Sequence, residues 1–122
     1  MEEIKLGMVE ARFADLVWQR APLTTRELVS ECEKKFNWKR TTTYTVLKKL
    51  CDKGLFKTEN SIITSVISRK EFYAIQSERF VEDAFDGSLP AFIAAFASRK
   101  KPDKRELDRI RLMLEELDKE DK

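Results

Sequence analysis

The chain contains no histidine, so it lacks the side chain that most often serves as a general base or a metal ligand near neutral pH. It has only three glycines, Gly7, Gly54 and Gly87. These are too scattered to form a phosphate-binding loop, and no motif for an activated nucleophile is present. The sequence therefore predicts a protein that is not an enzyme and that needs no cofactor and no metal.

Long apolar runs are also missing. No stretch approaches the ~18 apolar residues that a membrane-spanning helix needs. The N-terminal segment MEEIKLGMVE does not have the basic-then-apolar order of a signal peptide. We therefore expect a cytoplasmic protein without membrane insertion.

Cysteine is scarce as well. Cys32 and Cys51 lie outside any CxxC or CxC pair, and each falls on an apolar helical stripe. This placement predicts core thiols, with a disulfide or a metal site as the alternative. The 122 residues, 42% of them hydrophobic, are enough for one domain or two small subdomains.

Apolar spacing and capping signals give the order of the elements. Thr24 and Glu27 form a capping box, and Gly54 is a helix-ending glycine. The periodicity predicts a short two-stranded hairpin within 55–67 and helices over 8–20, 25–36, 40–53, 69–85, 89–98 and 104–119. Three short helices followed by a hairpin form a winged helix-turn-helix. We expect a mostly α protein with a small β wing, composed of a DNA-binding domain (1–68) and a three-helix dimerisation domain (69–122).

Positive charge is concentrated around the third predicted helix. Although the net charge is only +2, residues 34–57 contain eight lysines and arginines and one acid, Asp52. Such a patch fits duplex DNA, and ordinary solvated lysines are the alternative. A helical wheel places Thr41, Tyr44, Thr45 and Lys48 on the outer face, although Thr41 could instead be only the N-cap. The predicted DNA contacts are Lys39, Arg40, Thr41, Thr42, Tyr44, Thr45, Lys48, Lys49 and Lys57.

The last predicted helix carries an apolar seam of two residues per heptad, which is typical of a helix that packs against another helix. We expect this seam to form a homodimer interface with help from the preceding helices. The residues predicted to dimerise are Phe72, Phe80, Phe92, Leu107, Ile110, Leu114 and Leu117.

These residues together resemble the BlaI/MecI/CopY family of bacterial repressors, which control β-lactamase, methicillin-resistance and copper genes. The resemblance runs from Leu6 to Leu117 and includes the segments LGMVE, LTTRELV, FDGS and AAF, together with Trp38, Thr42, Thr45, Lys49-Leu50 and Lys53-Gly54. It implies a homodimeric transcriptional repressor that binds a pseudopalindromic operator in promoter DNA and controls a β-lactamase operon or another resistance or stress operon.

The sequence also departs from the family pattern. The hairpin is short, and its tip, Glu59-Asn60-Ser61, lacks basic residues. The cysteine cluster of the copper branch is missing, which disfavours a copper sensor. The resemblance implies derepression by cleavage in the C-terminal domain, triggered by a membrane sensor protease system, or by another signal. The cut would fall between Ala95 and Phe96, where the well-known members have asparagine before the phenylalanine. In structural terms Phe96 is also simply a core aromatic.

One alternative of a different class remains. Some winged helices are protein-interaction modules that bind no DNA, because a fold does not fix a function. Such a module need not expose a hydroxyl-rich, basic third helix, and this feature separates the two hypotheses.

Overall fold

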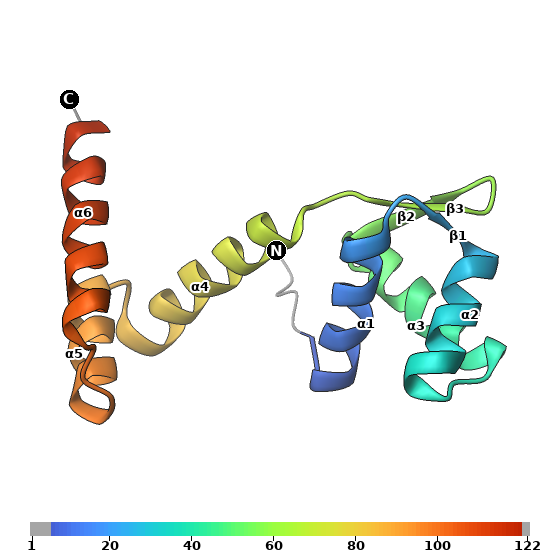
Figure 1. Cartoon of the computed structure of the whole chain (residues 1–122), viewed down its shortest axis with the longest axis horizontal. Coiled ribbons are helices and arrows are strands. Elements are labelled where there is room, and N and C mark those ends of the chain that lie inside the picture. Colours follow the sequence, from blue (N-terminus) through green and yellow to red (C-terminus); the bar gives the residue numbers. More distant parts are fainter. Residues whose placement is uncertain (1–5, 121–122) are drawn as a thin grey trace. The chain divides into compact units, whose positions relative to one another are not determined.

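The computed structural model describes residues 6–120 (Figure 1). This part of the chain contains six helices and three short strands, which confirms the mostly α fold with a small wing. The chain divides into two compact units, one ending at Ser77 and one beginning at Glu78. We describe each unit by itself. The division into domains at residues 68 and 69 stays a prediction.

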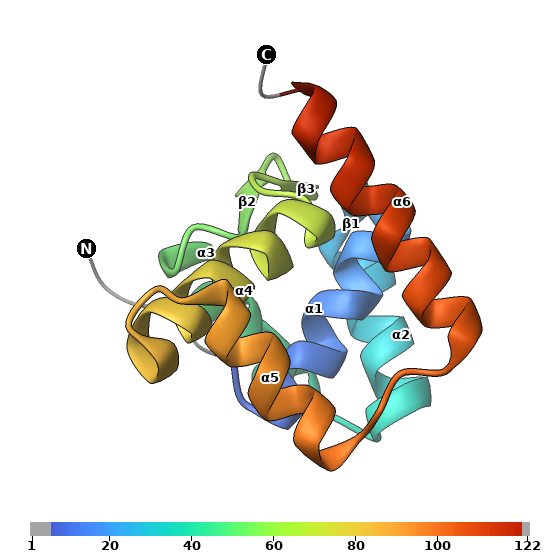
Figure 2. The same ribbon diagram turned by 90° about the vertical axis from the view of Figure 1, so that its left-hand side faces the viewer.

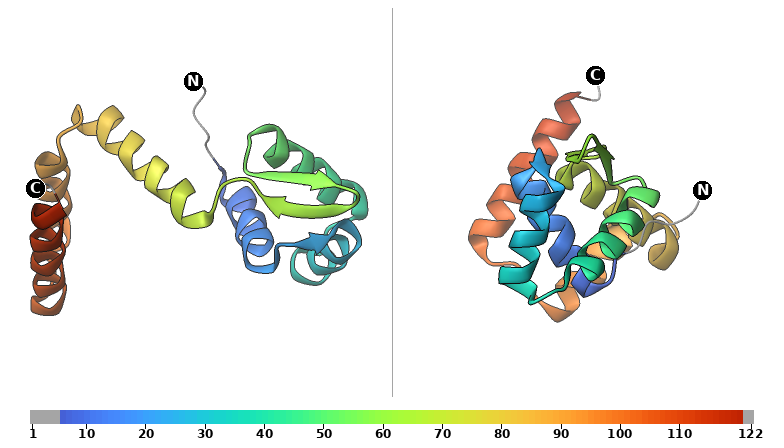
Figure 3. Two further views of the ribbon diagram at one scale, coloured as in Figure 1. Left: turned by 90° about the horizontal axis from the view of Figure 1, so that it is seen from above. Right: turned by 90° about the vertical axis from the view of Figure 1, so that its right-hand side faces the viewer.

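The N-terminal unit is a winged helix built from α1 (Met8–Arg20), α2 (Thr25–Phe36), α3 (Arg40–Asp52) and a small sheet. The wing strands β2 (Phe56–Glu59) and β3 (Ile62–Ser65) form the predicted hairpin (Figure 3). A third strand, β1 (Leu23–Thr24), pairs antiparallel with β3, so the sheet order is β1-β3-β2. This two-residue strand was not predicted, because it is defined only by its pairing with β3.

Local signals in the sequence set the ends of these elements. Thr24 accepts from the Glu27 N–H at 3.1 Å, and the Glu27 carboxylate accepts from the Thr24 N–H at 3.0 Å, so the predicted capping box starts α2. Gly54, which follows the C-cap Lys53 of α3, has φ +90°, a conformation that favours glycine. Asn60 and Ser61 both have positive φ. Such a pair suits a two-residue hairpin turn whose twist matches the strands.

The hydrophobic core of this unit lies between the three helices and the sheet. Phe13, Leu28, Leu50, Phe56 and Ile63 are all essentially inaccessible. Burying a side chain of this size contributes roughly 1.5–3 kcal/mol, so the core anchors all the elements that position α3.

The structure corrects the prediction that Phe72 lies at the dimer interface. It lies in α4 (Arg69–Phe85) and is only 2% exposed. Its ring lies 5.6 Å from that of Trp18, and the Trp18 indole N–H donates to the Ile67 carbonyl at 2.9 Å. Phe72 is therefore covered by its own chain, and the start of α4 completes the core of the N-terminal unit.

The C-terminal unit contains the end of α4, α5 (Leu89–Arg99) and α6 (Lys104–Glu120). The Ser88 hydroxyl accepts from the Ala91 N–H at 3.1 Å, and Asp103 and Glu106 form a reciprocal cap at the start of α6. Figure 2 shows α5 and α6 as distinct helices joined by a short link. No residue of either helix is fully buried, so this unit has much apolar surface that the chain does not cover.

Candidate nucleic-acid interface

The outer face of α3 is the surface that the sequence predicted to contact DNA. Thr43, Leu47 and Leu50 are buried, and they hold the helix against the core. The four outer residues, Thr41, Tyr44, Thr45 and Lys48, are exposed, as are Lys39, Arg40, Thr42, Lys49 and Lys57. All the residues predicted to contact DNA are thus accessible to a ligand. That they bind DNA stays a prediction.

The threonines of α3 are not N-caps. Lys39 occupies the N-cap position without a side-chain cap bond, and Thr41 lies inside the first turn. The Thr45 hydroxyl donates to the Thr41 carbonyl at 2.9 Å. Because the Thr45 hydroxyl proton is already donated within the helix, Thr45 can offer a binding partner its methyl group and its hydroxyl oxygen as an acceptor.

The lysines of the basic patch differ in their partners. Lys48 Nζ lies 2.9 Å from Asp52 Oδ2 on the exposed side of the helix, and Lys57 Nζ lies 3.5 Å from Glu59 Oε1. Lys49 Nζ is instead 3.1 Å from Glu10 Oε2 of α1. Lys48 and Lys57 form only exposed pairs, which are weak and readily exchanged for a phosphate.

Glu10 joins the start of α1 to the end of α3. Its carboxylate accepts from the Gly7 N–H at 3.1 Å and also lies 3.8 Å from Lys53 Nζ. The Gly7 N–H, together with Lys49 and Lys53, lowers the pKa of Glu10, although partial burial opposes this shift. The side chain is only 17% exposed. The end of α3 is therefore fixed to α1 by a charged contact that the sequence did not reveal.

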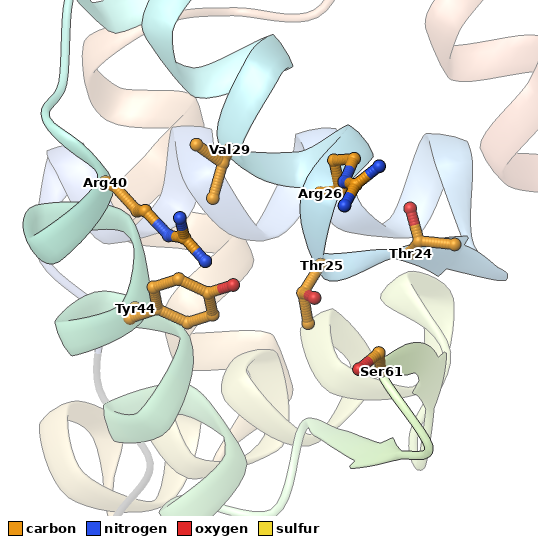
Figure 4. A pocket seen from close by; sticks show the side chains of 7 residues that line it. All are labelled: Thr24, Thr25, Arg26, Val29, Arg40, Tyr44 and Ser61. Atoms are coloured by element: carbon orange, nitrogen blue, oxygen red, sulfur yellow. The ribbon is translucent and has the colours of Figure 1, made fainter.

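A hollow of about 520 Å³ opens beside the outer face of α3. We name it the Arg26/Arg40 pocket. Figure 4 shows its lining residues, which come from the end of β1, from α2 and α3, and from the wing tip: Thr24, Thr25, Arg26, Val29, Arg40, Tyr44 and Ser61.

The hydroxyl of Tyr44 belongs to this pocket. The Arg40 guanidinium carbon lies 5.5 Å from the centre of the Tyr44 ring. A hydrogen bond with Thr25 lowers the pKa of the Tyr44 hydroxyl, and the charges of Arg40 and Arg26 act in the same direction. Arg26 was not among the predicted DNA contacts. Its place in the first turn of α2, next to a capping box in a helix-turn-helix, was the one signal that could have indicated it.

The residues predicted to dimerise fall into two sets, apart from Phe72. Phe80 and Phe92 lie 6.0 Å apart between ring centres, within an aromatic cluster that includes Phe85 and Phe96. On α6, Leu107 is half-buried, whereas the other three remain exposed: Ile110, Leu114 and Leu117. Their role at an interface stays a prediction.

The predicted cleavage residues, Ala95 and Phe96, lie within α5, and both are exposed. The prediction that Phe96 is a core aromatic is therefore wrong for the single chain, because Phe96 is 53% exposed. Cleavage between the two residues stays a prediction. Within residues 6–120, no group of acidic or cysteine side chains could hold a metal ion. No helix of the described chain is long and apolar enough to cross a membrane. Cys32 is buried, which raises the pKa of its thiol, and neither Cys32 nor Cys51 forms a disulfide.

The chain was compared with models of protein families and with curated proteins. The family model described as penicillinase repressor matches residues 6–116 of the 122. No curated protein matches the chain.

Proposed function

The chain belongs to the penicillinase repressor family, a family of transcriptional repressors, and from that membership we propose that it is a homodimer that binds a pseudopalindromic operator. In this proposal the protein acts in the cytoplasm. The bound dimer covers a promoter and so represses a β-lactamase operon or another resistance or stress operon.

The exposed face of α3 is the observation that carries this proposal. An α-helix fits the major groove of B-DNA, where hydroxyl and methyl groups such as those of Thr41 and Thr45 meet base edges and thymine methyls. Lys48 and Arg40 lie exposed beside them and suit the phosphate backbone, which supplies most of the affinity. The wing tip has no basic residue, so we expect the wing to contribute little beyond Lys57.

The apolar surface of α6 supports dimerisation. Ile110, Leu114 and Leu117 follow a seam spacing and stay exposed in the single chain. Exposed apolar seams of this kind are typical of surfaces that a second copy covers. A twofold dimer presents two α3 helices to two half-sites, and this matches an operator with dyad symmetry.

Cleavage at Ala95–Phe96 would explain derepression. A cut there separates α6, which carries the seam, from the N-terminal unit, which carries α3. A monomeric N-terminal fragment keeps about half of the DNA contacts and releases the operator. We propose a membrane sensor protease system as the trigger.

Footprinting of the region upstream of the gene, followed by anisotropy titration of the protected sequence over a range of salt concentrations, tests this function. We expect a protected pseudopalindrome and an affinity that falls steeply with salt. Equal affinity for the protected and a scrambled duplex, or a monomeric mass for the full chain at micromolar concentration, would overturn the proposal.

A further inference from the structure

We propose that the Arg26/Arg40 pocket binds a phosphoryl group. Arg26 comes from the first turn of α2 and Arg40 from the first turn of α3, and both contribute to the lining of the same hollow. Within residues 6–120, neither arginine forms an ion pair with a carboxylate. Two guanidinium groups that line one pocket, neither of them paired with a carboxylate of the described residues, favour the binding of an anion there.

The directions of the hydrogen-bond donors identify the class of anion. Arginine groups approach from α2 and α3, the Tyr44 hydroxyl from α3, and the Ser61 hydroxyl from the wing tip (Figure 4). Donors that surround a site from several directions suit a tetrahedral oxyanion better than a planar carboxylate, which presents only two oxygens.

Three backbone N–H groups at the start of α2 are already hydrogen-bonded within the chain, so they are not available to the anion. The Thr24 N–H and the Glu27 N–H are used by the capping box, and the Thr25 N–H donates to the Ser61 carbonyl at 2.9 Å. This last bond fixes the wing tip against α2. The side chains, rather than a bare helix end, are therefore the groups that receive the phosphoryl group.

This assignment gives Tyr44 a different role from base reading. Its hydroxyl is directed toward Thr25 and the pocket, so it contacts the phosphoryl group and confers affinity without sequence preference. Two sources could supply the group: the backbone of the DNA, in which case the inference rests on the proposed function, or a free phosphorylated compound.

The first arm of the test uses inorganic phosphate. ¹H–¹⁵N spectra of the full chain are recorded at constant ionic strength while phosphate replaces chloride. We expect saturable shifts of the Thr25, Tyr44 and Ser61 amides. The shifts should disappear in the double variant Arg26→Gln/Arg40→Gln. They should persist in Arg12→Gln, which removes one positive charge from an exposed position of α1.

The second arm measures binding of a random-sequence 20-base-pair duplex as salt is varied. One phosphate contact contributes about 0.9 to the slope of log affinity against log salt. Because both arginines hold the same phosphate, each single variant should lose about 0.9 from the slope, and the double variant should lose no more. The Tyr44→Phe variant should weaken operator and random duplexes by the same factor.

Saturable shifts with unchanged or additive slopes support the pocket and identify a free phosphorylated compound as the source. A shared slope loss, with or without shifts, supports the pocket and identifies the DNA backbone. Absent shifts together with additive or unchanged slopes overturn the inference, even if the duplex binds and the repressor function stands. If the wild-type chain binds no duplex but phosphate still shifts the three amides, the repressor function fails and the pocket stands.

Discussion

Lys48 and Lys49 are neighbours on α3, yet replacing each by Gln should affect a different quantity: DNA binding for Lys48 and the stability of the fold for Lys49. The Lys48 side chain is 78% exposed, and its ammonium lies 2.9 Å from the Asp52 carboxylate. The Lys49 ammonium lies 3.1 Å from Glu10, whose side chain is 17% exposed. We therefore expect Lys48 to contact DNA. Lys49 was also predicted as a DNA contact, but its pairing with Glu10 leads us to expect that it acts mainly on stability.

The structure sets the size of each effect. If Lys48 contacts one phosphate, Lys48→Gln should reduce the salt slope by about 0.9. Over a fourfold rise in salt the variant then loses about 3.5-fold less affinity than the wild type. Lys49→Gln should leave the slope unchanged but lower the free energy of unfolding by about 1 kcal/mol, the upper end for a surface pair, because Glu10 is mostly covered. Lys53 Nζ lies 3.8 Å from Glu10 and still pairs with this carboxylate in the variant, which limits the loss of stability.

Anisotropy of a labelled random duplex over a salt series gives the slope, and urea unfolding gives the stability. The control Lys119→Gln removes the same charge from an exposed position of α6 and should change neither quantity appreciably. If Lys49→Gln reduces the slope as much as Lys48→Gln while its urea midpoint stays at the wild-type value, the assignment of Lys49 to the fold is wrong.

Three further predictions follow from contacts described above. Phe72→Ala should lower the free energy of unfolding by about 3–5 kcal/mol in urea titrations, because Phe72 packs under Trp18; a loss below about 1 kcal/mol would contradict its place in the core. Leu114→Asp should give a monomer in light scattering and a weaker operator complex, with an unchanged unfolding midpoint of the N-terminal unit; a stable dimer would remove α6 from the interface. The pKa of Glu10 is lowered from 4.5 in the folded chain, so Glu10 adds stability above that pH, and this stability is lost as the pH falls through the lowered value. Glu10→Gln should therefore destabilise the chain at pH 7 and much less at about pH 3, and an equal loss at both would refute the charged contact.

Element boundaries were predictable where a side chain marks them. The predicted helices over 25–36 and 69–85 coincide with α2 and α4, because Thr24 and Ser68 cap their first turns. Strand β1 had no such mark. Its two residues become a strand only by pairing with β3, which lies some forty residues later, and no local pattern encodes that pairing.

Helical periodicity shows which face of a helix is apolar but not what covers it. Phe72 and Phe80 lie on one stripe of α4, yet Phe72 is buried in the core and Phe80 is half exposed. For the same reason the sequence did not predict the place of Arg26 in the pocket or the ion pair of Glu10 with Lys49. A helical wheel treats each helix alone, whereas the Arg26/Arg40 pocket and the Glu10–Lys49 contact each arise where two helices meet.

The outer edge of the wing has a consequence for how the protein behaves at high concentration. Strand β2 is an edge of the sheet, has only four residues and carries the charged side chains of Lys57 and Glu59. Short, charged edges resist the addition of a strand from another molecule. We therefore expect the β2 edge of the wing to resist aggregation by strand addition at high protein concentration.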